Sequence, residues 1–142
     1  MLRMLIAIDG SENSRRAVDH VLHLARAGCR PHDVHVLNVQ PPIPFADIKR
    51  FIGQDAINAY YHDEGAKALA SARAVLDPSD VPHTFHIAVG APAETVVNYA
   101  REHQCGQIIL GCRGLSGLSG LLLGSVASKV LHLAHVPVTL VK

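Results

Sequence analysis

The chain has 142 residues and a mass of 15.2 kDa, the size of one domain. Apolar residues make up 49% of the sequence and charged residues 18%, a balance typical of globular proteins that excludes a disordered chain. Thirteen basic and 12 acidic residues leave a formal charge of +1, so we expect no broad nucleic-acid-binding surface.

The first part of the chain alternates strand and helix patterns. Residues 3–9 are a short apolar run, typical of a strand buried on both faces. The run is too short to span a membrane and resembles no signal peptide. Serine and asparagine side chains then offer N-caps for a helix whose apolar residues recur every three or four positions until Gly28. A second strand is predicted over 34–39, and three prolines end it.

The middle of the chain continues the alternation. An alanine-rich helix is predicted over about 55–76, and a third strand over 83–89. Pro92 suits the first position of the next helix, although Ala91 before it has no side chain that can cap. A fourth strand is predicted over 107–110.

The last part of the chain predicts a helix over 125–134 and a fifth strand over 136–141. Apolar residues of this helix are predicted to face inward: Val126, Val130, Leu131 and Leu133. Short buried strands that alternate with helices predict an α/β fold, a parallel sheet with helices on both faces. We find no linker or second domain, so one domain is predicted over 1–142.

Cysteine and histidine positions predict neither a disulfide framework nor a metal site. The three cysteines are scattered, without a C-x-x-C pair, so we expect reduced thiols and a cytoplasmic protein. Cys112 is interpreted as a small buried or half-buried thiol. Two pairs of histidines lie three residues apart near predicted helices, and we interpret them as solvated.

The most distinctive segment is 111–125, which holds five of the 11 glycines and leads into a predicted helix at Ser125. In open parallel sheets, ligands bind at the carboxyl ends of strands. A glycine-rich loop before a helix N-terminus offers main-chain N–H donors to an anion, most naturally a phosphate. The P-loop lysine is missing before Ser125, and no G-x-G-x-x-G follows the first strand. The alternative is a loop whose glycines only allow the backbone to turn and do not bind a ligand.

The spacing Gly111, Gly114, Gly124, Ser125 resembles the G-x2-G-x9-G-[ST] pattern of universal stress proteins of the ATP-binding branch. Residues 5–11 resemble the opening strand of that family, and residues 135–138 resemble its closing segment. The resemblance covers the whole chain. It implies a single three-layer α/β domain with strand order 3-2-1-4-5, similar to the adenine nucleotide α-hydrolases.

The resemblance also implies a set of nucleotide-binding residues. Asp9 would lie near the ribose or a phosphate-bound Mg²⁺, and the main chain of Val39 would recognise adenine. The implied set is Ala7, Ile8, Asp9, Val39, Leu110, Gly111, Arg113, Gly114, Gly124, Ser125 and Val126. The expected cofactors are ATP, or AMP or another adenine nucleotide, with Mg²⁺. Asn38 and Ala91 depart from the family, which often has histidine at the first position and aspartate or asparagine at the second.

The resemblance further implies a homodimer formed by the C-terminal strand, through Val136, Pro137, Val138, Thr139, Leu140 and Val141. A strand at a sheet edge leaves N–H and C=O groups that can pair with another chain. We expect a nucleotide-responsive stress or signalling protein with a further protein partner. Two alternatives stay open: an interaction module of the same fold that uses no nucleotide, and a very slow ATP hydrolase, since the P-loop lysine is missing.

Overall fold

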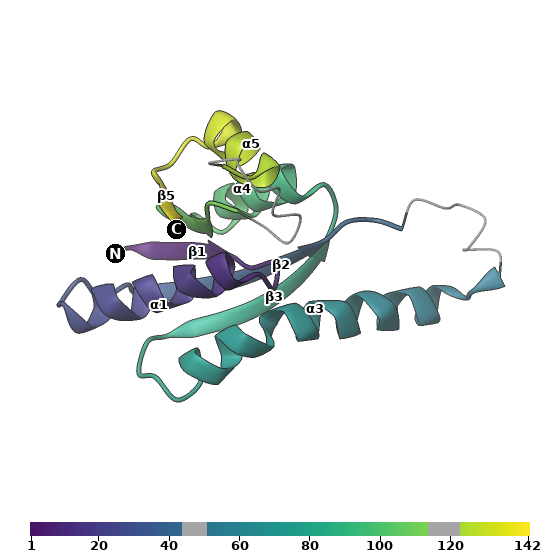
Figure 1. The fold of residues 1–142 in the computed structure, drawn as a ribbon, viewed down its shortest axis with the longest axis horizontal. Helices are drawn as coiled ribbons and strands as arrows, with labels where there is room; N and C mark the ends of the chain where they lie inside the picture. The colour runs from purple at the N-terminus through teal and green to yellow at the C-terminus, as the bar shows by residue number, and fades with distance from the viewer. Residues whose placement is uncertain (44–50, 114–122) are drawn as a thin grey trace.

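The computed structural model describes residues 1–43, 51–113 and 123–142. Strands and helices alternate along it (Figure 1). The elements are β1 Arg3–Ala7, α1 Glu12–Arg26, β2 Asp33–Gln40, α3 Gln54–Leu76, β3 His83–Val89, α4 Pro92–Glu102, β4 Gln107–Gly111, α5 Ser125–Leu133 and β5 Val138–Val141.

The five strands form one parallel sheet in the order β3-β2-β1-β4-β5, which confirms the predicted order. Helices α1 and α3 cover one face of the sheet, and α4 and α5 cover the other (Figure 1). Each face has its own apolar core. Val18 and Leu69 belong to the first core, and Val97 and Val130 belong to the second. The carboxyl ends of β1, β2 and β4 meet at one edge, where Ala7 pairs with both Leu37 and Leu110.

The first strand ends earlier than predicted, at Ala7 instead of Asp9. Ile8 still donates its N–H to the carbonyl of Leu37 at 2.9 Å. The chain then turns, because Gly10 has a φ of +88°, a left-handed conformation that favours glycine. Ile8 and Asp9 therefore belong to the loop after the strand.

The C-terminal elements also differ from the prediction. Strand β5 begins at Val138, because Pro137 has no N–H to donate and only its carbonyl joins β4, accepting from Ile108 at 3.0 Å. In α5 the buried residues are Ala127 and Val130. The other predicted inward residues are exposed: Val126, Leu131 and Leu133. This helix has only nine residues and lies at the edge of the sheet, so only a narrow stripe of its residues is buried against its neighbours.

Helix termini follow the sequence expectations. Ser11 is the N-cap of α1, and its Oγ accepts from the N–H of Ser14 at 3.2 Å. Ala91 precedes α4 without a side-chain cap, as predicted. Among the described residues, no helix is both long enough and apolar enough to cross a membrane.

Candidate functional site

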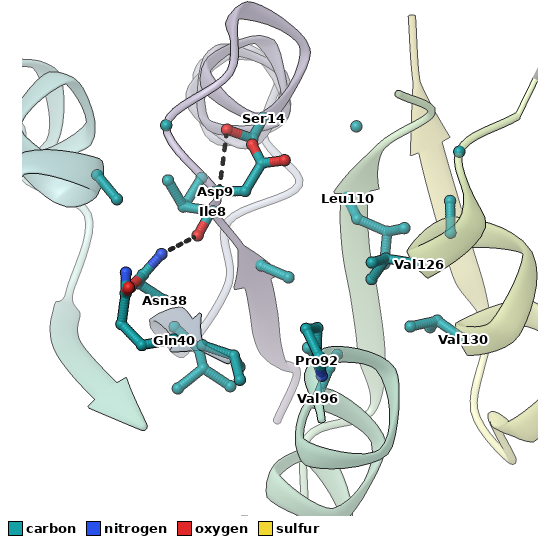
Figure 2. A pocket seen from close by; sticks show the side chains of 18 of the residues that line it. Ile8, Asp9, Ser14, Asn38, Gln40, Pro92, Val96, Leu110, Val126 and Val130 are labelled. Atoms are coloured by element: carbon teal, nitrogen blue, oxygen red, sulfur yellow. Dashed lines mark hydrogen bonds between the residues drawn. The ribbon is translucent and has the colours of Figure 1, made fainter. Parts of the chain in front are cut away.

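A pocket of about 650 Å³ lies at the carboxyl ends of β1, β2 and β4 (Figure 2). Its size falls within the usual range for small-molecule sites, roughly 300–1,000 Å³. Helix α3 forms one wall, and the first turns of α4 and α5 form the opposite one. Strands β2 and β4 lie on either side of β1 here, so residues far apart in the sequence converge.

Ten of the eleven predicted nucleotide-binding residues line this pocket. They are Ala7, Ile8, Asp9, Val39, Leu110, Gly111, Arg113, Gly124, Ser125 and Val126. The eleventh, Gly114, lies outside the described residues. The fold therefore brings together three segments that the sequence analysis had selected separately.

The loop after β1 is held by its own polar side chains. The Asp9 carboxylate accepts from the N–H of Ser11 at 2.9 Å, and the Ser14 hydroxyl donates to the carbonyl of Ser11 at 2.9 Å. Gly10 packs against α3, where a Cβ would lie 3.5 Å from the Cα of Ala68. These contacts fix the position of Asp9 at the rim of the pocket (Figure 2).

Gly111 serves packing inside the protein. A Cβ at this position would lie 2.6 Å from the carbonyl carbon of Asn13 and 2.8 Å from the nitrogen of Ser14. No side chain fits there, because the first turn of α1 lies directly against the end of β4. The glycine that was predicted to admit a ligand is therefore needed for the contact between β4 and α1.

Helix α5 begins at the pocket. Its N-cap is Gly124, which has no side chain to cap the helix, and the N–H of Gly124 donates to the carbonyl of Cys112 at 2.6 Å. The N–H groups of a first helical turn have no acceptor within the helix, and they carry the positive end of its dipole. Ser125 and Val126 supply two of these groups at the pocket wall. Cys112 is buried, as predicted.

The sequence analysis missed the pocket residues of α3 and α4 and the polar side chains of β2. Glu64 and Lys67 of α3 form an ion pair of 3.1 Å, and the Glu64 carboxylate raises the pKa of Lys67. Pro92 and Val96 come from α4. The amino-acid sequence of α3 does not indicate that this helix crosses over the strand ends. A polar residue in an apolar strand, Asn38, was the available signal for β2.

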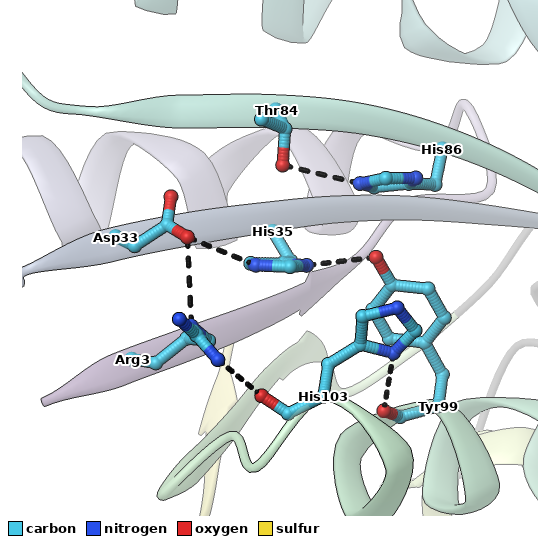
Figure 3. Close-up of polar contacts among 7 residues, drawn as sticks. All are labelled: Arg3, Asp33, His35, Thr84, His86, Tyr99 and His103. Carbon is cyan, nitrogen blue, oxygen red and sulfur yellow. Dashed lines mark hydrogen bonds and ion pairs between the residues drawn. The ribbon is translucent and has the colours of Figure 1, made fainter.

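A second group of polar side chains lies away from this pocket, between β2, β3 and α4 (Figure 3). We call His35, His86, Tyr99 and His103 the histidine cluster. His35 is buried, and its Nε2 lies 3.0 Å from the Asp33 carboxylate while its Nδ1 lies 2.7 Å from the Tyr99 hydroxyl. An ionised carboxylate can only accept, so Nε2 carries a proton; in the neutral ring Nδ1 then accepts from the Tyr99 hydroxyl.

The rings of the histidine cluster form two stacked pairs, which meet each other edge-on or tilted. The His35 and His86 rings are 5.4 Å apart and nearly parallel, and those of Tyr99 and His103 are 3.8 Å apart. Burial lowers the pKa of His86, and the neighbouring His35 and His103 lower it further. Burial also raises the pKa of Tyr99. Within the described ranges no three His, Cys, Asp or Glu side chains are arranged to hold a metal ion.

Comparisons with known proteins cover the full length of the chain. The model of the universal stress protein family matches residues 1–142. Universal stress protein YxiE of Bacillus subtilis is 33% identical over 149 aligned residues, which cover 99% of this chain and 98% of YxiE. The solved structure of hypothetical protein MJ0577 has a TM-score of 0.84 and 26% identity, with 99% of this chain and 95% of that chain covered. A universal stress protein in complex with cAMP has a TM-score of 0.59 and 25% identity, with 99% and 95% covered.

Proposed function

The chain belongs to the universal stress protein family, and we propose that it binds an adenine nucleotide in the pocket at the carboxyl ends of β1, β2 and β4. The observation that carries the proposal is the composition of the pocket. One side has a helix N-terminus and an arginine, and the interior is largely apolar. A nucleotide has the same division, because its phosphate is anionic and its base is a flat ring with polar edges.

The phosphate end of the ligand is assigned to the start of α5. The N–H groups of Ser125 and Val126 would donate to phosphate oxygens, and the helix dipole would favour the negative charge. Arg113 would add a cation at the same side. The sequence between 114 and 122 has no charged residue, so this loop could contribute main-chain N–H groups and the hydroxyls of Ser116 and Ser119.

The base is assigned to the apolar part of the pocket near the end of β2. Val39 and Pro41 come from this side, while Leu110 and Val96 close the pocket from β4 and α4. Apolar side chains suit the faces of a purine, and the ends of strands supply main-chain groups for its edge.

Asp9 is proposed to lie near the ribose or a phosphate-bound Mg²⁺. Magnesium is usually held by one or two carboxylates together with substrate phosphates, so a single aspartate beside the phosphate end fits this ion. A bound Mg²⁺ would neutralise phosphate charge; Asp9 itself would orient the ion.

Titration calorimetry with ATP, AMP and cAMP, with and without Mg²⁺, tests the proposal. The relative that is solved with cAMP is a reason to include the cyclic nucleotide. We expect micromolar binding to the native chain and a loss of at least about tenfold in Gly124→Val, whose side chain would project where phosphate approaches. Gly53→Val is the matched control. Gly53 is also a helix N-cap, its ψ of 158° equals that of Gly124, and nothing lies within 4 Å of its Cβ position.

Two results would contradict the proposal. Native protein that binds none of the three nucleotides would favour the interaction module that uses no nucleotide. Equal affinities of Gly124→Val and native protein would move the phosphate end away from α5. Phosphate release above background would point to the slow hydrolase, and its loss in Asp9→Ala would assign that activity to this pocket.

A homodimer through the C-terminal strand is part of the same proposal. Strand β5 pairs with β4 on one side, and its four residues are half-buried. Val136 and Pro137 precede it and would extend the contact. Light scattering at micromolar concentration should give about twice the chain mass. The main-chain groups of Pro137 and Val141 face β4, so those of the alternate residue Leu140 face the free edge, and Leu140→Pro should give the monomer because it removes a donor there. A native protein that scatters as a 15.2 kDa species would refute the dimer.

A further inference from the structure

Two amide side chains of β2 form a hydrogen-bonded pair at the side of the pocket opposite α5 (Figure 2). Asn38 is 2% exposed, and its Nδ2 donates to the carbonyl of Ile8 at 2.8 Å. The Nε2 of Gln40 donates to the Oδ1 of Asn38 at 2.7 Å. Asn38 and Gln40 alternate along the strand, so both side chains lie on the same face of the sheet.

This pair has one consistent orientation. A main-chain carbonyl can only accept, so Asn38 must turn its nitrogen toward Ile8 and its oxygen toward Gln40. Gln40 must then turn its own nitrogen toward Asn38. The carbonyl of Ile8 therefore sets the orientation of the Gln40 amide through Asn38. Oε1 is the atom of the Gln40 amide that the pair does not use.

A locked amide at this place can read the edge of a purine. With the phosphate at the start of α5, an extended nucleotide brings its base toward the end of β2. The Nε2 of Gln40 carries a second hydrogen besides the one that it donates to Asn38, so the amide still offers an acceptor and a donor side by side, which match the exocyclic amine and N7 of adenine. In a 6-oxopurine the amine is replaced by a carbonyl oxygen, which would face the oxygen of Gln40.

We propose that Gln40 selects adenine over 6-oxopurine bases, and that Asn38 is a positioning residue that holds the Gln40 amide in the selective orientation. This inference rests on the proposed function of the pocket. An amide that was free to rotate would donate its N–H to a 6-oxo group, and the pocket would then bind both kinds of base. Selectivity therefore depends on Asn38 as much as on Gln40.

Calorimetric titration of the full chain with AMP and with IMP measures the selectivity directly. We expect native protein to prefer AMP by roughly ten- to a hundredfold, the range for a bidentate contact to a base edge. Gln40→Leu should bring the ratio of the two dissociation constants close to one by weakening AMP. Asn38→Ala should also lower the ratio, but by strengthening IMP, since its Gln40 can rotate. A side chain with a purely structural role would change both affinities together.

The control is a second pair of the same kind outside the pocket. Gln54 donates from Nε2 to the Oδ1 of Asn58 at 2.9 Å on the exposed start of α3, so Gln54→Leu should leave the ratio unchanged. Thermal melts by circular dichroism verify that each variant is folded. Gln40 lies at the rim of the pocket, so we expect Gln40→Leu to fold. This variant tests the proposal even if Asn38→Ala unfolds.

The outcomes separate this inference from the function on which it rests. A native ratio that persists in Gln40→Leu, or a native protein without preference between AMP and IMP, overturns the role of Gln40 and leaves nucleotide binding intact. Native protein that binds neither AMP nor ATP nor cAMP overturns both.

Discussion

The pocket and the histidine cluster gather polar side chains in different ways. In the histidine cluster, both ring nitrogens of His35 have partners, and the four rings form two stacked pairs (Figure 3). The pocket has about 650 Å³ of space, and its wall combines strand ends, a glycine N-cap and apolar side chains (Figure 2). The comparison teaches that a concentration of titratable groups is not itself a ligand site. The pocket differs because it has empty space next to hydrogen-bond donors and acceptors at the carboxyl ends of the strands.

The largest effect is expected from Gly111, where the pocket meets the core. Gly111→Ala would place a Cβ 2.6 Å from the main chain of Asn13, so α1 or β4 must shift. We expect a loss of about 3 kcal/mol in the free energy of unfolding, at the upper end for overpacking, together with weaker nucleotide binding. Urea denaturation measures the loss. The matched control is Gly53→Ala, because nothing lies within 4 Å of that Cβ position. A stable Gly111→Ala with native affinity would show that the contact between β4 and α1 is adaptable.

A substitution inside the histidine cluster should affect stability and spare the pocket. His35→Ala removes the ring that contacts the Asp33 carboxylate and the Tyr99 hydroxyl; Asp33 keeps its ion pair with Arg3 at 3.5 Å, and the Tyr99 hydroxyl loses this contact. Unpaired buried polar groups cost roughly 1–3 kcal/mol, so we expect a destabilisation of about 2 kcal/mol. Calorimetric nucleotide affinity should stay within about twofold of native at 15 °C, where the variant is folded. A larger loss of affinity would mean that the two regions are coupled through α4.

The pH dependence of stability should come from the histidine cluster. Since burial lowers the pKa of His86 below about 6.5, its value in an unfolded chain, the unfolded form takes up more protons as pH falls. The contribution of His86 to the free energy of unfolding is therefore fully present above pH 6.5. It is lost as the pH falls toward the pKa that His86 has in the folded protein. His35 and His103 add to the effect, and Asp33 opposes it.

Urea denaturation between pH 5 and 7.5 measures this dependence, and we expect it to be smaller than the effect of either substitution above. His86→Gln should flatten the curve below pH 6.5. His62→Gln, which changes an exposed histidine on α3, serves as the control. Equal slopes for native protein and His86→Gln would assign the acid sensitivity to another group.

The smallest effect is expected at Ala91, at the start of the helix that both regions share. Ser at this N-cap would accept from the N–H groups of the first turn, and we expect a stabilisation of about 0.5–1 kcal/mol. Thermal melting of Ala91→Ser measures it. Unchanged stability would mean that water already satisfies those groups as well as a side chain can. Nucleotide affinity should not fall.

The sequence predicted the pocket better than the histidine cluster, for a physical reason. The 111–125 glycines form a local pattern that marked Gly124, and the family resemblance implied Asp9 and Val39, so all three could be named without a structure. His83 and His86 lie three residues apart on β3 and therefore on opposite faces of the strand: His83 contacts Asp77, and His86 joins the histidine cluster. The partners of His86 could not be predicted, because they depend on the register of β2 against β3 and on the rotation of α4. Both are set by packing across the sheet.

Helix α4 connects the two regions, with Pro92 and Val96 in the pocket and Tyr99 and His103 in the histidine cluster. Eleven residues of helix span about 16 Å, so a movement of its first turn is carried rigidly to its last. The stacked imidazoles feel strong ring currents, which makes their proton resonances sensitive to small rotations of the neighbouring phenol. If a ligand in the pocket displaced the first turn of α4, these proton resonances would report the movement without a fluorophore or an isotope label.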